Sequence, residues 1–406
     1  MKRFGLLGAH LGHSYSPQLH ALLGGYPYEL FEVAPEDLDS FLRAAPFDGC
    51  NVTIPYKQTV LPYCAELSDT ARRIGSVNTL LRCAGGSLYG DNTDYGGFLH
   101  LLERCGGIAP GERAMILGSG GASKTAAAVL EDCGASTVVI SRTGEHRYEA
   151  LEDFSDTTVL VNATPVGMYP ANGISPVSLD RLPRCRLVLD LVYNPAKTAL
   201  LLDAERRGLA FANGLPMLVE QAALASERFT GKQIAAAVRK NVLCKLSAEM
   251  RNIILIGMPG CGKTTIGRAL AADTGRRFLD ADEELEKRLG CNIPRYFSEH
   301  AESEFRQEET KLLAELGKQS GCVIATGGGC VTVPQNRALL WQNGTVIWLK
   351  RPLSMLAIEG RPVSLSTPVE ALYARRAPLY AAFSDRCAEN NSDIQTAVAA
   401  VKEICL

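Results

Sequence analysis

One segment constrains the fold more than any other, because an apolar strand, a glycine-rich turn and a helix follow one another without a break. It reads RNIILIGMPGCGKTTIGRALAADTG, and its turn fits G-x-x-x-x-G-K-[ST] at every position from Gly257 to Thr264. Backbone amides and the helix N-terminus of such a loop cradle phosphates. Lys263 is expected to reach the β- and γ-phosphates, and the Thr264 hydroxyl to hold Mg²⁺. The predicted nucleotide-binding residues are Gly260, Cys261, Gly262, Lys263, Thr264 and Thr265.

The alternation of short β-branched runs with helical patterns predicts α/β architecture with parallel sheets along the chain of 406 residues. AMILGSG followed by KTAAAVLEDCG is one example. We predict a two-lobe first half, with a lobe at 1–100 and a Rossmann-like domain at 101–215. Helices at about 216–248 return to the first lobe, and a separate P-loop domain occupies 250–406. No Pro/Gly/Ser linker separates the halves, so the junction is expected to be short, stiff and helical.

Composition narrows the function classes. A formal net charge of -2 gives no reason to expect nucleic acid or an anionic membrane as partner. No apolar run approaches the ~20 residues needed to span a bilayer, and the run after MKRF is too short for a signal peptide and is expected to be the first strand. The 13 cysteines form no C-x-x-C pair, which favours reduced thiols in a cytoplasmic protein. Homo-oligomer formation stays open.

Further polar residues follow the P-loop and distinguish a kinase from other nucleotide-binding classes. FLDADEELEKRLG places Asp280 and Asp282 at a strand end, where alternation points both side chains toward the phosphates. SEFRQEE puts Arg306 on a helix, and ATGGGCV puts three glycines after a strand, where a backbone approaches a ligand closely. EGRPVS and ARRAPLY add Arg361 and Arg376.

This set, in this order and spacing, resembles shikimate kinase, a small P-loop kinase, over nearly all of residues 250–406. The resemblance implies that Asp282 hydrogen-bonds the substrate hydroxyls beside the attacking one, and that Arg306 and Arg376 grip the shikimate carboxylate. Planar guanidinium forks suit a carboxylate, and phosphoryl transfer depends on positioning and charge neutralisation. The resemblance places these residues next to the glycine triplet Gly327, Gly328 and Gly329.

Two further roles in the P-loop half come from the same resemblance. Asp280 would support Mg²⁺, and Arg361 would enter over the γ-phosphate from a lid. The lid segment is short, however, and carries no further arginine between Arg351 and Arg361. Nucleotide closure is therefore the part of this site where the chain departs from the family pattern.

A second glycine loop lies in the first half, where GERAMILGSGGASKTAAAVLEDCGASTVVISRT reads strand, turn, helix, strand. Ser123 stands where the dinucleotide fingerprint has a third glycine. An NAD site would place an acid at the end of the second strand, whereas this chain has Arg142 between two hydroxyl residues, which favours the 2′-phosphate of NADP. The predicted cofactor residues are Gly118, Ser119, Gly120, Gly121, Ala122, Ser141, Arg142 and Thr143.

The first lobe offers small polar side chains that suit a polyhydroxylated ligand. Ser14 and Ser16 are expected to point the same way from an extended segment before Pro17. NVTIPYKQ supplies one lysine, and GDNTDYGGF supplies one aspartate at a strand-to-helix turn. The candidate residues in this lobe are Ser14, Ser16, Asn51, Thr53, Lys57, Asn78 and Asp94.

The combination of HSYSP, NVTIPYK, GSVNTL, GDNTD, GSGGAS, NATPVGM and GLPMLVEQAA resembles shikimate dehydrogenase over about residues 3–240. The resemblance implies that Lys57 and Asp94 form the catalytic pair, and that Gly214 and Met217 lie near the nicotinamide. Pro216 stands where many relatives have glycine and removes a backbone N–H, so a contact there must rest on a carbonyl or be altered. The implied substrate residues are Ser14, Ser16, Thr53, Lys57, Asn78, Asp94 and Gln221.

The sequence thus predicts a bifunctional enzyme that reduces 3-dehydroshikimate with NADPH and phosphorylates the resulting shikimate with Mg²⁺-ATP. Its predicted catalytic residues are Lys57, Asp94, Lys263, Asp282 and Arg361. Three alternatives remain open at this point. The first half could be an NAD-dependent quinate/shikimate dehydrogenase or a non-catalytic sensing or scaffold module. The second half could be a nucleotide or gluconate kinase.

Overall fold

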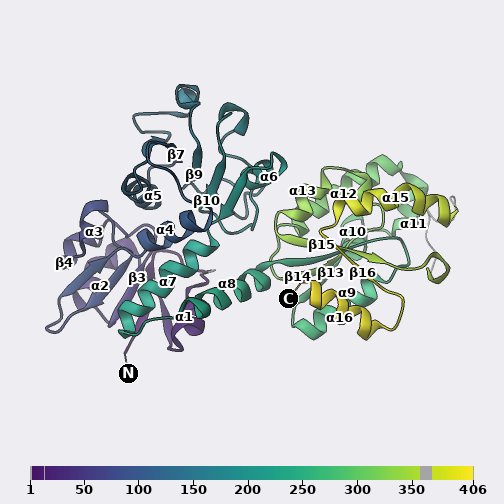
Figure 1. Cartoon of the computed structure of the whole chain (residues 1–406). Helices are drawn as coiled ribbons and strands as arrows, with labels where there is room; N and C mark the ends of the chain where they lie inside the picture. Colours follow the sequence, from purple (N-terminus) through teal and green to yellow (C-terminus); the bar gives the residue numbers. More distant parts are fainter. Residues whose placement is uncertain (1, 13, 357–367, 406) are drawn as a thin grey trace. The chain divides into compact units, whose positions relative to one another are not determined.

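The computed structural model describes residues 2–12, 14–356 and 368–405. The chain divides into two units, each an α/β structure (Figure 1). The first unit comprises 1–166, 174–193 and 203–245, and the second comprises 167–173, 194–202 and 246–406. The predicted fold class, α/β throughout, is confirmed, whereas the limits predicted for the individual domains remain predictions.

A six-stranded sheet in the order β2-β1-β3-β5-β6-β4 forms the first part of the first unit. The MKRFGLLG segment supplies β1, as predicted, and this strand lies parallel to its neighbours on both sides. The strands are β1 (Phe4–Gly8), β2 (Tyr28–Glu32), β3 (Gly49–Val52), β4 (Cys64–Leu67), β5 (Thr79–Arg82) and β6 (Leu88–Asp91). The helices are α1 (Ser16–Gly24), α2 (Leu38–Ala44) and α3 (Asp69–Ile74).

The first sheet is mixed, with parallel and antiparallel pairs. β5 pairs antiparallel with both β3 and β6. The physical reason is a tight turn between β5 and β6, in which Gly85 and Gly86 both have positive φ angles. A two-strand hairpin closes through such a turn, whereas a parallel pair needs a long crossover.

A five-stranded sheet in the order β11-β10-β9-β7-β8 forms the second part of the unit, and all its pairs are parallel. Its central strands are fully buried, as near-continuous apolar runs in parallel sheets predict. The strands are β7 (Arg113–Leu117), β8 (Ser136–Ile140), β9 (Val159–Asn162), β10 (Leu187–Asp190) and β11 (Ala210–Asn213). The helices are α4 (Asp94–Arg104), α5 (Gly121–Asp132) and α7 (Leu215–Thr230), and the residues of α6 (Ala199–Arg206) are divided between the two units.

Helix α7 returns to the first sheet, as the sequence predicts. The Phe229 ring stacks on the Phe4 ring with centroids 5.1 Å apart. Near its other end, α7 lies close against α4, because a Cβ atom at Gly97 would lie 2.8 Å from the Met217 carbonyl oxygen. Glycine at this position therefore lets the two helices approach and brings Gln221 to the beginning of α4.

The second unit is built on a parallel sheet in the order β13-β14-β12-β15-β16. Helix α8 (Ala236–Met250) leads into its central strand, so the predicted helical junction is present. The strands are β12 (Asn252–Ile256), β13 (Arg277–Asp280), β14 (Cys322–Ala325), β15 (Gly344–Lys350) and β16 (Arg386–Glu389). The helices are α9 (Lys263–Thr274), α10 (Ala281–Leu289), α11 (Ile293–Glu299), α12 (Glu302–Leu316), α13 (Asn336–Trp341), α15 (Val369–Phe383) and α16 (Ile394–Cys405).

Two whole-chain expectations can be compared with the structure. All 13 cysteines are free thiols, as their spacing predicts. Over the residues that the structure describes, no helix combines the length and apolar character needed to cross a membrane.

Candidate active sites

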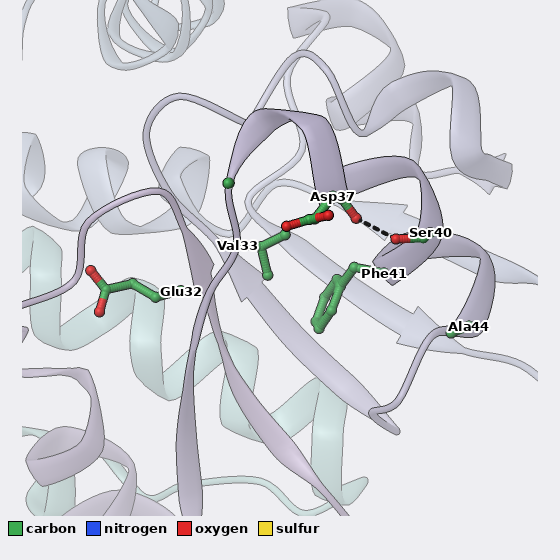
Figure 2. Close-up of a pocket in the computed structure, with 7 residues that line it drawn as sticks. Glu32, Val33, Asp37, Ser40, Phe41 and Ala44 are labelled. Atoms are coloured by element: carbon green, nitrogen blue, oxygen red, sulfur yellow. Dashed lines mark hydrogen bonds between the residues drawn. The ribbon is translucent and has the colours of Figure 1, made fainter.

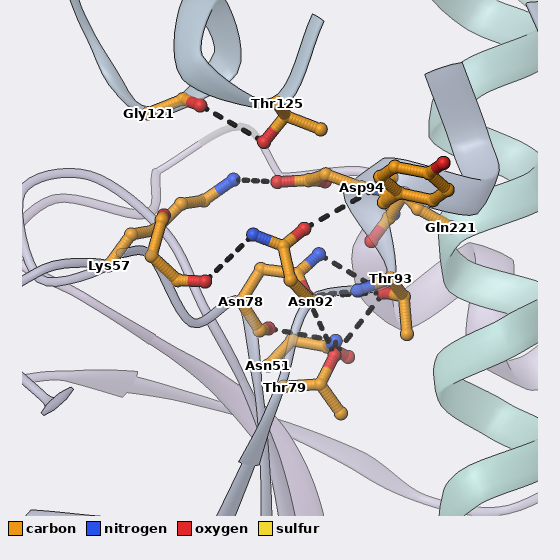
Figure 3. Close-up of polar contacts among 12 residues, drawn as sticks. Asn51, Lys57, Asn78, Thr79, Asn92, Thr93, Asp94, Gly121, Thr125 and Gln221 are labelled. Atoms are coloured by element: carbon orange, nitrogen blue, oxygen red, sulfur yellow. Dashed lines mark hydrogen bonds and ion pairs between the residues drawn. The ribbon is translucent and has the colours of Figure 1, made fainter. Parts of the chain in front are cut away.

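The first candidate site is centred on an ion pair between Lys57 and Asp94. Asp94 is the first residue of α4, separated from the end of β6 by two residues, and Lys57 lies in the turn that follows β3. The Lys57 Nζ atom is 2.6 Å from the Asp94 Oδ2 atom, and their side chains are 23% and 9% exposed. Figure 3 shows the two groups facing each other at the N-terminal end of α4. The ammonium therefore remains partly open to solvent, while the carboxylate that holds it is buried.

A buried amide and hydroxyl network supports this pair from below (Figure 3). The Asn78 Oδ1 atom accepts the Thr93 amide at 2.7 Å, which fixes the residue immediately before Asp94. The Thr79 hydroxyl donates to the same Asn78 oxygen at 3.0 Å. The Asn51 side chain in turn donates to Thr79 Oγ1 at 3.1 Å. Sequence reasoning singled out Asn51 and Asn78 but missed both threonines, whose only signal was their position next to residues of the GSVNTL and GDNTD motifs.

The dinucleotide loop lies next to the Lys57 side chain. A Cβ atom at Gly121 would be 3.2 Å from Ser76 Oγ and 3.9 Å from Lys57 Cδ. Gly121 is also the first residue of α5, and Gly118, Ser119 and Gly120 connect that helix to β7. A phosphate-binding helix N-terminus and a cationic acid–base candidate thus lie side by side.

Ser123 explains how the chain dispenses with the third fingerprint glycine. Its side chain is buried, and its hydroxyl donates to the Gly118 carbonyl oxygen at 2.6 Å. Gly118 itself has a φ of 107°, a conformation that favours glycine. The serine therefore closes the loop with a hydrogen bond at the point where other loops use a close backbone approach.

The residues predicted to select NADP lie directly after β8. Ser141 is buried, its amide donates to the His146 carbonyl, and its Oγ atom has no partner among the described residues. Arg142 and Thr143 are exposed. An exposed guanidinium beside a buried, unpartnered hydroxyl suits a phosphate oxygen.

Ser14 and Ser16 do not lie on an extended segment, so that prediction is wrong. Tyr15, between them, has right-handed helical dihedrals, and Ser16 begins α1. The Ser14 hydroxyl oxygen accepts the Ser16 amide at 3.2 Å. Pro17 in the first turn has a φ angle that suits a helix and lacks an N–H that the helix would not use, so the chain turns where alternation alone predicted a strand.

The remaining predicted residues of this site lie on several different elements. Thr53 follows β3, and its amide donates to the Leu7 carbonyl. Gln221 lies on α7, where its side chain donates to the Leu218 carbonyl at 2.8 Å. Gly214 is the N-cap of α7, Met217 is buried in its first turn, and Pro216 falls in that same turn. Pro216 therefore costs the helix no hydrogen bond.

Asn162 and Asp190 were not predicted as site residues, yet they shape the ends of β9 and β10. The Asn162 side-chain amide donates to Asp190 Oδ1 at 2.9 Å. Asn162 Oδ1 accepts hydrogen bonds from the Thr164 amide at 3.1 Å and from the Thr164 hydroxyl at 2.6 Å. Because ligands of parallel α/β sheets bind beyond the carboxyl ends of the strands, this network fixes the loop that follows β9 on the ligand side. The NATPVGM motif was its only sequence signal.

The second candidate site is centred on the P-loop. Gly257, Gly260 and Gly262 all have positive φ angles, which explains the glycine spacing of the motif. Lys263 is buried, and its Nζ atom donates to the Gly257 and Met258 carbonyl oxygens at 2.9 and 3.1 Å. The ammonium is thus held against the loop that it is predicted to serve.

Asp280 and Asp282 do not share one strand, which corrects the alternation argument. β13 ends at Asp280, and Asp282 lies in the first turn of α10. Asp280 is the N-cap of that helix and accepts the amides of Asp282 and Glu283. Its other oxygen, Oδ2, accepts the Thr264 hydroxyl at 2.7 Å. The two oxygens predicted to hold Mg²⁺ therefore lie side by side.

The glycine triplet faces acidic and basic side chains on two helices. A Cβ atom at Gly327 would be 2.8 Å from Asp282 Oδ1, and one at Gly329 would be 2.1 Å from Arg306 Nη2. A larger residue at either position would displace these side-chain ends. Arg306 donates to Glu309 Oε2 at 2.7 Å, and the Arg306 side chain is 11% exposed.

Glu309 was missed by sequence reasoning, although it lies on the same helix as Arg306. Burial raises the pKa of Glu309 above its ordinary value, while the neighbouring Arg306 favours its charged form. The signal that could have found it is the spacing of Arg306 and Glu309 on α12, three residues apart and so on one face.

Arg376 is a fully buried arginine, with 1% of its surface exposed. Its Nη1 atom donates to the Gly328 carbonyl at 3.3 Å, but Nε and Nη2 have no partner among the described residues. The Tyr380 hydroxyl donates to the same carbonyl at 2.6 Å. A buried N–H without an acceptor is costly, so the unpartnered nitrogens mark Arg376 as a candidate to bind an anionic ligand.

Arg361, the predicted lid residue, lies outside the described residues. Among residues 2–12, 14–356 and 368–405, no group of three or more His, Cys, Asp and Glu side chains is arranged to hold a metal ion. Any Mg²⁺ site would therefore combine Asp280 and Thr264 with oxygens of the nucleotide and water.

A hollow of about 490 Å³ lies apart from both clusters, beside β2 and α2 (Figure 2). Its lining includes Glu32, Asp37 and Phe41, and the Ser40 hydroxyl donates to the Asp37 carbonyl at 2.8 Å. None of the predicted site residues lines it. Its volume therefore adds nothing to the assignment of either site.

Comparisons with known proteins match both halves. A family model described as shikimate dehydrogenase substrate binding domain matches residues 6–80, and one described as shikimate kinase matches residues 259–405. The NADP⁺-dependent shikimate dehydrogenase of Shouchella clausii is 36% identical over 261 residues, which cover 57% of this chain and 94% of the relative.

Two solved structures give the same result for the first half. A chorismate mutase/shikimate 5-dehydrogenase fusion protein from Clostridium acetobutylicum is 36% identical with a TM-score of 0.57, and the match covers 61% of this chain and 97% of that one. A shikimate 5-dehydrogenase from Thermus thermophilus, in complex with NADP(H) and shikimate, is 35% identical with a TM-score of 0.55. That match covers 60% of this chain and 99% of the other.

Proposed function

The chain belongs to the shikimate dehydrogenase family in its first part, carries a shikimate kinase domain at 259–405, and is thus a bifunctional enzyme of the shikimate pathway; from this premise we propose how its residues perform the two reactions. The first site reduces 3-dehydroshikimate to shikimate, and the second phosphorylates the 3-hydroxyl of shikimate. The observation that carries the proposal is the presence of two separate clusters of polar side chains. Each combines a phosphate-binding loop with side chains suited to a small hydroxylated acid.

In the first site we assign Lys57 as general acid. NADPH, when bound, supplies the hydride that goes to the carbonyl carbon. The Lys57 ammonium gives its proton to the carbonyl oxygen as negative charge develops there, and Lys57 regains a proton from solvent, to which its side chain is 23% exposed. Asp94 holds the ammonium in place at 2.6 Å. Asn78 positions Asp94 through the Thr93 amide.

The neutral groups of the first site bind the hydroxyls and carboxylate of the substrate. Small hydroxyl and amide groups can both donate and accept, which suits a ligand with several hydroxyls. Because Lys57 is the only cation in this set of residues, the set carries little positive charge apart from the proton donor itself. The proposed substrate-binding residues are Ser14, Ser16, Thr53, Asn78 and Gln221, with Lys57 and Asp94.

In the second site we assign Asp282 to the attacking hydroxyl of shikimate, and Arg306 and Arg376 to its carboxylate. The unpartnered N–H groups of both arginines support this assignment, since Arg306 Nε and Arg376 Nε and Nη2 lack acceptors among the described residues. Lys263 and the loop amides bind the nucleotide phosphates. Mg²⁺, when bound to oxygens at Thr264 and Asp280, would neutralise charge on the phosphates.

The NAD-dependent quinate/shikimate alternative is disfavoured by the end of β8. An NAD site requires an acid for the ribose 2′-hydroxyl, and this chain has Ser141, Arg142 and Thr143 there. The non-catalytic alternative is disfavoured by the intact Lys57–Asp94 pair. We therefore propose NADP(H) as the cofactor.

The cofactor assignment predicts the effect of replacing Arg142. In Arg142→Ala, the KM for NADPH should rise about tenfold or more, because one charge-assisted hydrogen bond to phosphate is lost. The KM for NADH, which lacks the 2′-phosphate, should stay the same. Steady-state absorbance assays with both cofactors check this, and Arg147→Ala, at an exposed position nearby, is the matched control. An equal change for NADPH and NADH would refute the assignment.

The proposed function as a whole is tested by one assay of the purified chain. With 3-dehydroshikimate, NADPH, ATP and Mg²⁺, we expect NADPH oxidation and formation of shikimate 3-phosphate. Separate assays with shikimate, nucleoside monophosphates and gluconate as phosphoryl acceptors identify the kinase substrate. Phosphorylation of a nucleotide or gluconate in preference to shikimate would contradict the kinase assignment.

A further inference from the structure

The strand order of the second unit gives the P-loop two different neighbours. The loop follows the central strand β12, and Asp282 and the glycine triplet lie on the side of β13 and β14. On the other side, β15 ends at Lys350 and β16 at Glu389, so Arg351 and Asn390 directly follow the two strands. Ligands bind beyond the carboxyl ends of such sheets. If the acceptor lies on the first side, the nucleoside end of ATP lies on the second.

Arg351 and Asn390 both lie against the P-loop. A Cβ atom at Gly262 would be 2.7 Å from Asn390 Nδ2 and 3.7 Å from Arg351 Nη1. Asn390 has a structural use, because its Nδ2 atom donates to the Cys261 carbonyl at 2.8 Å. Arg351 has none that the described residues reveal, since its Nε atom is buried without a hydrogen-bond partner.

An arginine placed in this way has spare donors beside a phosphate-binding loop. The guanidinium carries five N–H donors, no acceptor and a permanent charge, and an unmet buried N–H costs free energy. A phosphate oxygen satisfies both the charge and the donors, in the forked geometry that arginine favours. In such a loop the lysine reaches the β- and γ-phosphates and the backbone amides cradle the α- and β-phosphates, so no side chain of the loop is assigned to the α-phosphate.

We propose that Arg351 binds the α-phosphate of the nucleotide and completes the P-loop from the β15 side. This inference rests on the proposed ATP-dependent kinase activity of the second unit. It adds a binding residue from the carboxyl end of β15, which the family resemblance did not assign. It also places a cation near the nucleotide in a chain whose sequence has neither lysine nor arginine from 352 to 360.

The test is the Arg351→Gln variant of the full-length chain. We expect the KM for ATP to rise about tenfold or more, as for the loss of one charge-assisted hydrogen bond. The KM for shikimate and the rate of 3-dehydroshikimate reduction should stay the same. Arg351→Lys should recover part of the loss, because it restores the charge but not the fork. Arg386→Gln is the matched control, since Arg386 is exposed at the opposite end of β16.

Binding measurements keep the test independent of catalysis. Both tryptophans, Trp341 and Trp348, lie in the second unit, and Trp348 pairs with Ile256 of β12 immediately before the P-loop. Titration with ADP, followed by tryptophan fluorescence, should show weaker binding in Arg351→Gln by the same factor. Adenosine, tested as a competitive inhibitor against ATP, should be unaffected because it has no phosphate.

The possible outcomes separate this inference from the proposed function. Unchanged ADP binding in Arg351→Gln would overturn the inference, and so would an equal loss for adenosine, which would indicate contact with the base. A wild-type chain that binds ADP but does not phosphorylate shikimate would overturn the kinase assignment instead. The melting temperature without nucleotide should not fall in the variant, because Arg351 Nε has no partner to lose.

Discussion

Replacing Lys57 by alanine is expected to lower the rate of 3-dehydroshikimate reduction by about 10²–10⁴-fold, the usual contribution of a positioned general acid. The reason is the loss of the ammonium that the structure places against Asp94, at 2.6 Å, beside the dinucleotide loop. Phosphorylation of added shikimate should keep its wild-type rate, since Lys57 belongs to the first unit and the P-loop to the second. Stopped-flow and steady-state absorbance at the NADPH band measure the loss.

A second substitution separates proton transfer from charge. Lys57→Arg retains a cation for Asp94, but a guanidinium does not release its proton, so reduction should stay strongly impaired. Lys232→Ala is the matched surface control, because Lys232 is exposed. Near-normal reduction in Lys57→Ala would show that another group protonates the oxygen. Full activity in Lys57→Arg would reduce the role of Lys57 to electrostatic stabilisation.

Sequence patterns predict those parts of the sites in which a few residues determine the backbone conformation. The P-loop is the strongest case, because Gly257, Gly260 and Gly262 each adopt a positive φ angle that restricts the position to glycine. The strands that lead into both phosphate-binding loops were predicted for a similar reason. A buried parallel strand reads as a near-continuous apolar run, and β7 and β12 are both apolar after their first residue.

Sequence patterns fail where a single hydrogen bond from a side chain to the backbone changes the backbone conformation. Alternation placed Asp282 on a strand, but Asp280 caps a helix that begins at the next residue. Ser14 and Ser16 were expected on an extended segment, but the Ser14 hydroxyl accepts the Ser16 amide and the chain turns. Side-chain capping of this kind competes with regular secondary structure. A hydrophobic period of two or 3.6 residues gives no information about such capping.

Contacts between distant segments were beyond the reach of sequence reasoning. Thr93 and Asn78 are 15 residues apart and meet only because β5 and β6 pair antiparallel. The burial of Arg376 is a similar case. Its helix, α15, has little amphipathic pattern and includes Arg375 and Arg376 side by side, one exposed and one fully buried. Motif resemblance marked Arg376, but only packing shows that its guanidinium is buried.

Because Arg376 is buried, we expect its replacement to weaken ligand binding without lowering the stability of the substrate-free chain. Arg376→Met keeps an unbranched side chain but removes two nitrogen atoms, Nε and Nη2, whose N–H groups have no partner among the described residues, so the unfolding free energy without substrate should not fall. The KM for shikimate should increase by about 10- to 150-fold, because a charge-assisted hydrogen bond to its carboxylate is lost. The reductase rate should be unaffected, since this residue lies in the second unit.

Thermal or denaturant unfolding with added shikimate measures both effects at once. Because Trp341 and Trp348 are the only tryptophans and both lie in the second unit, their fluorescence reports the unfolding of that unit. Shikimate at 100 times its wild-type Kd should stabilise the wild-type unit by about 2.7 kcal/mol. If Kd rises about 100-fold, the same concentration should add only about 0.4 kcal/mol to Arg376→Met.

The neighbouring residue supplies the control for this experiment. Arg375 is exposed on the same helix, so Arg375→Met removes the same charge without changing the buried site. It should retain the full shikimate-dependent stabilisation and a wild-type KM. A large loss of stability in substrate-free Arg376→Met would show that the buried guanidinium supports the fold through Gly328 and not chiefly the ligand. Undiminished stabilisation by shikimate would remove Arg376 from the binding site, because a group that contacts the carboxylate cannot be lost without a loss of linkage between binding and folding.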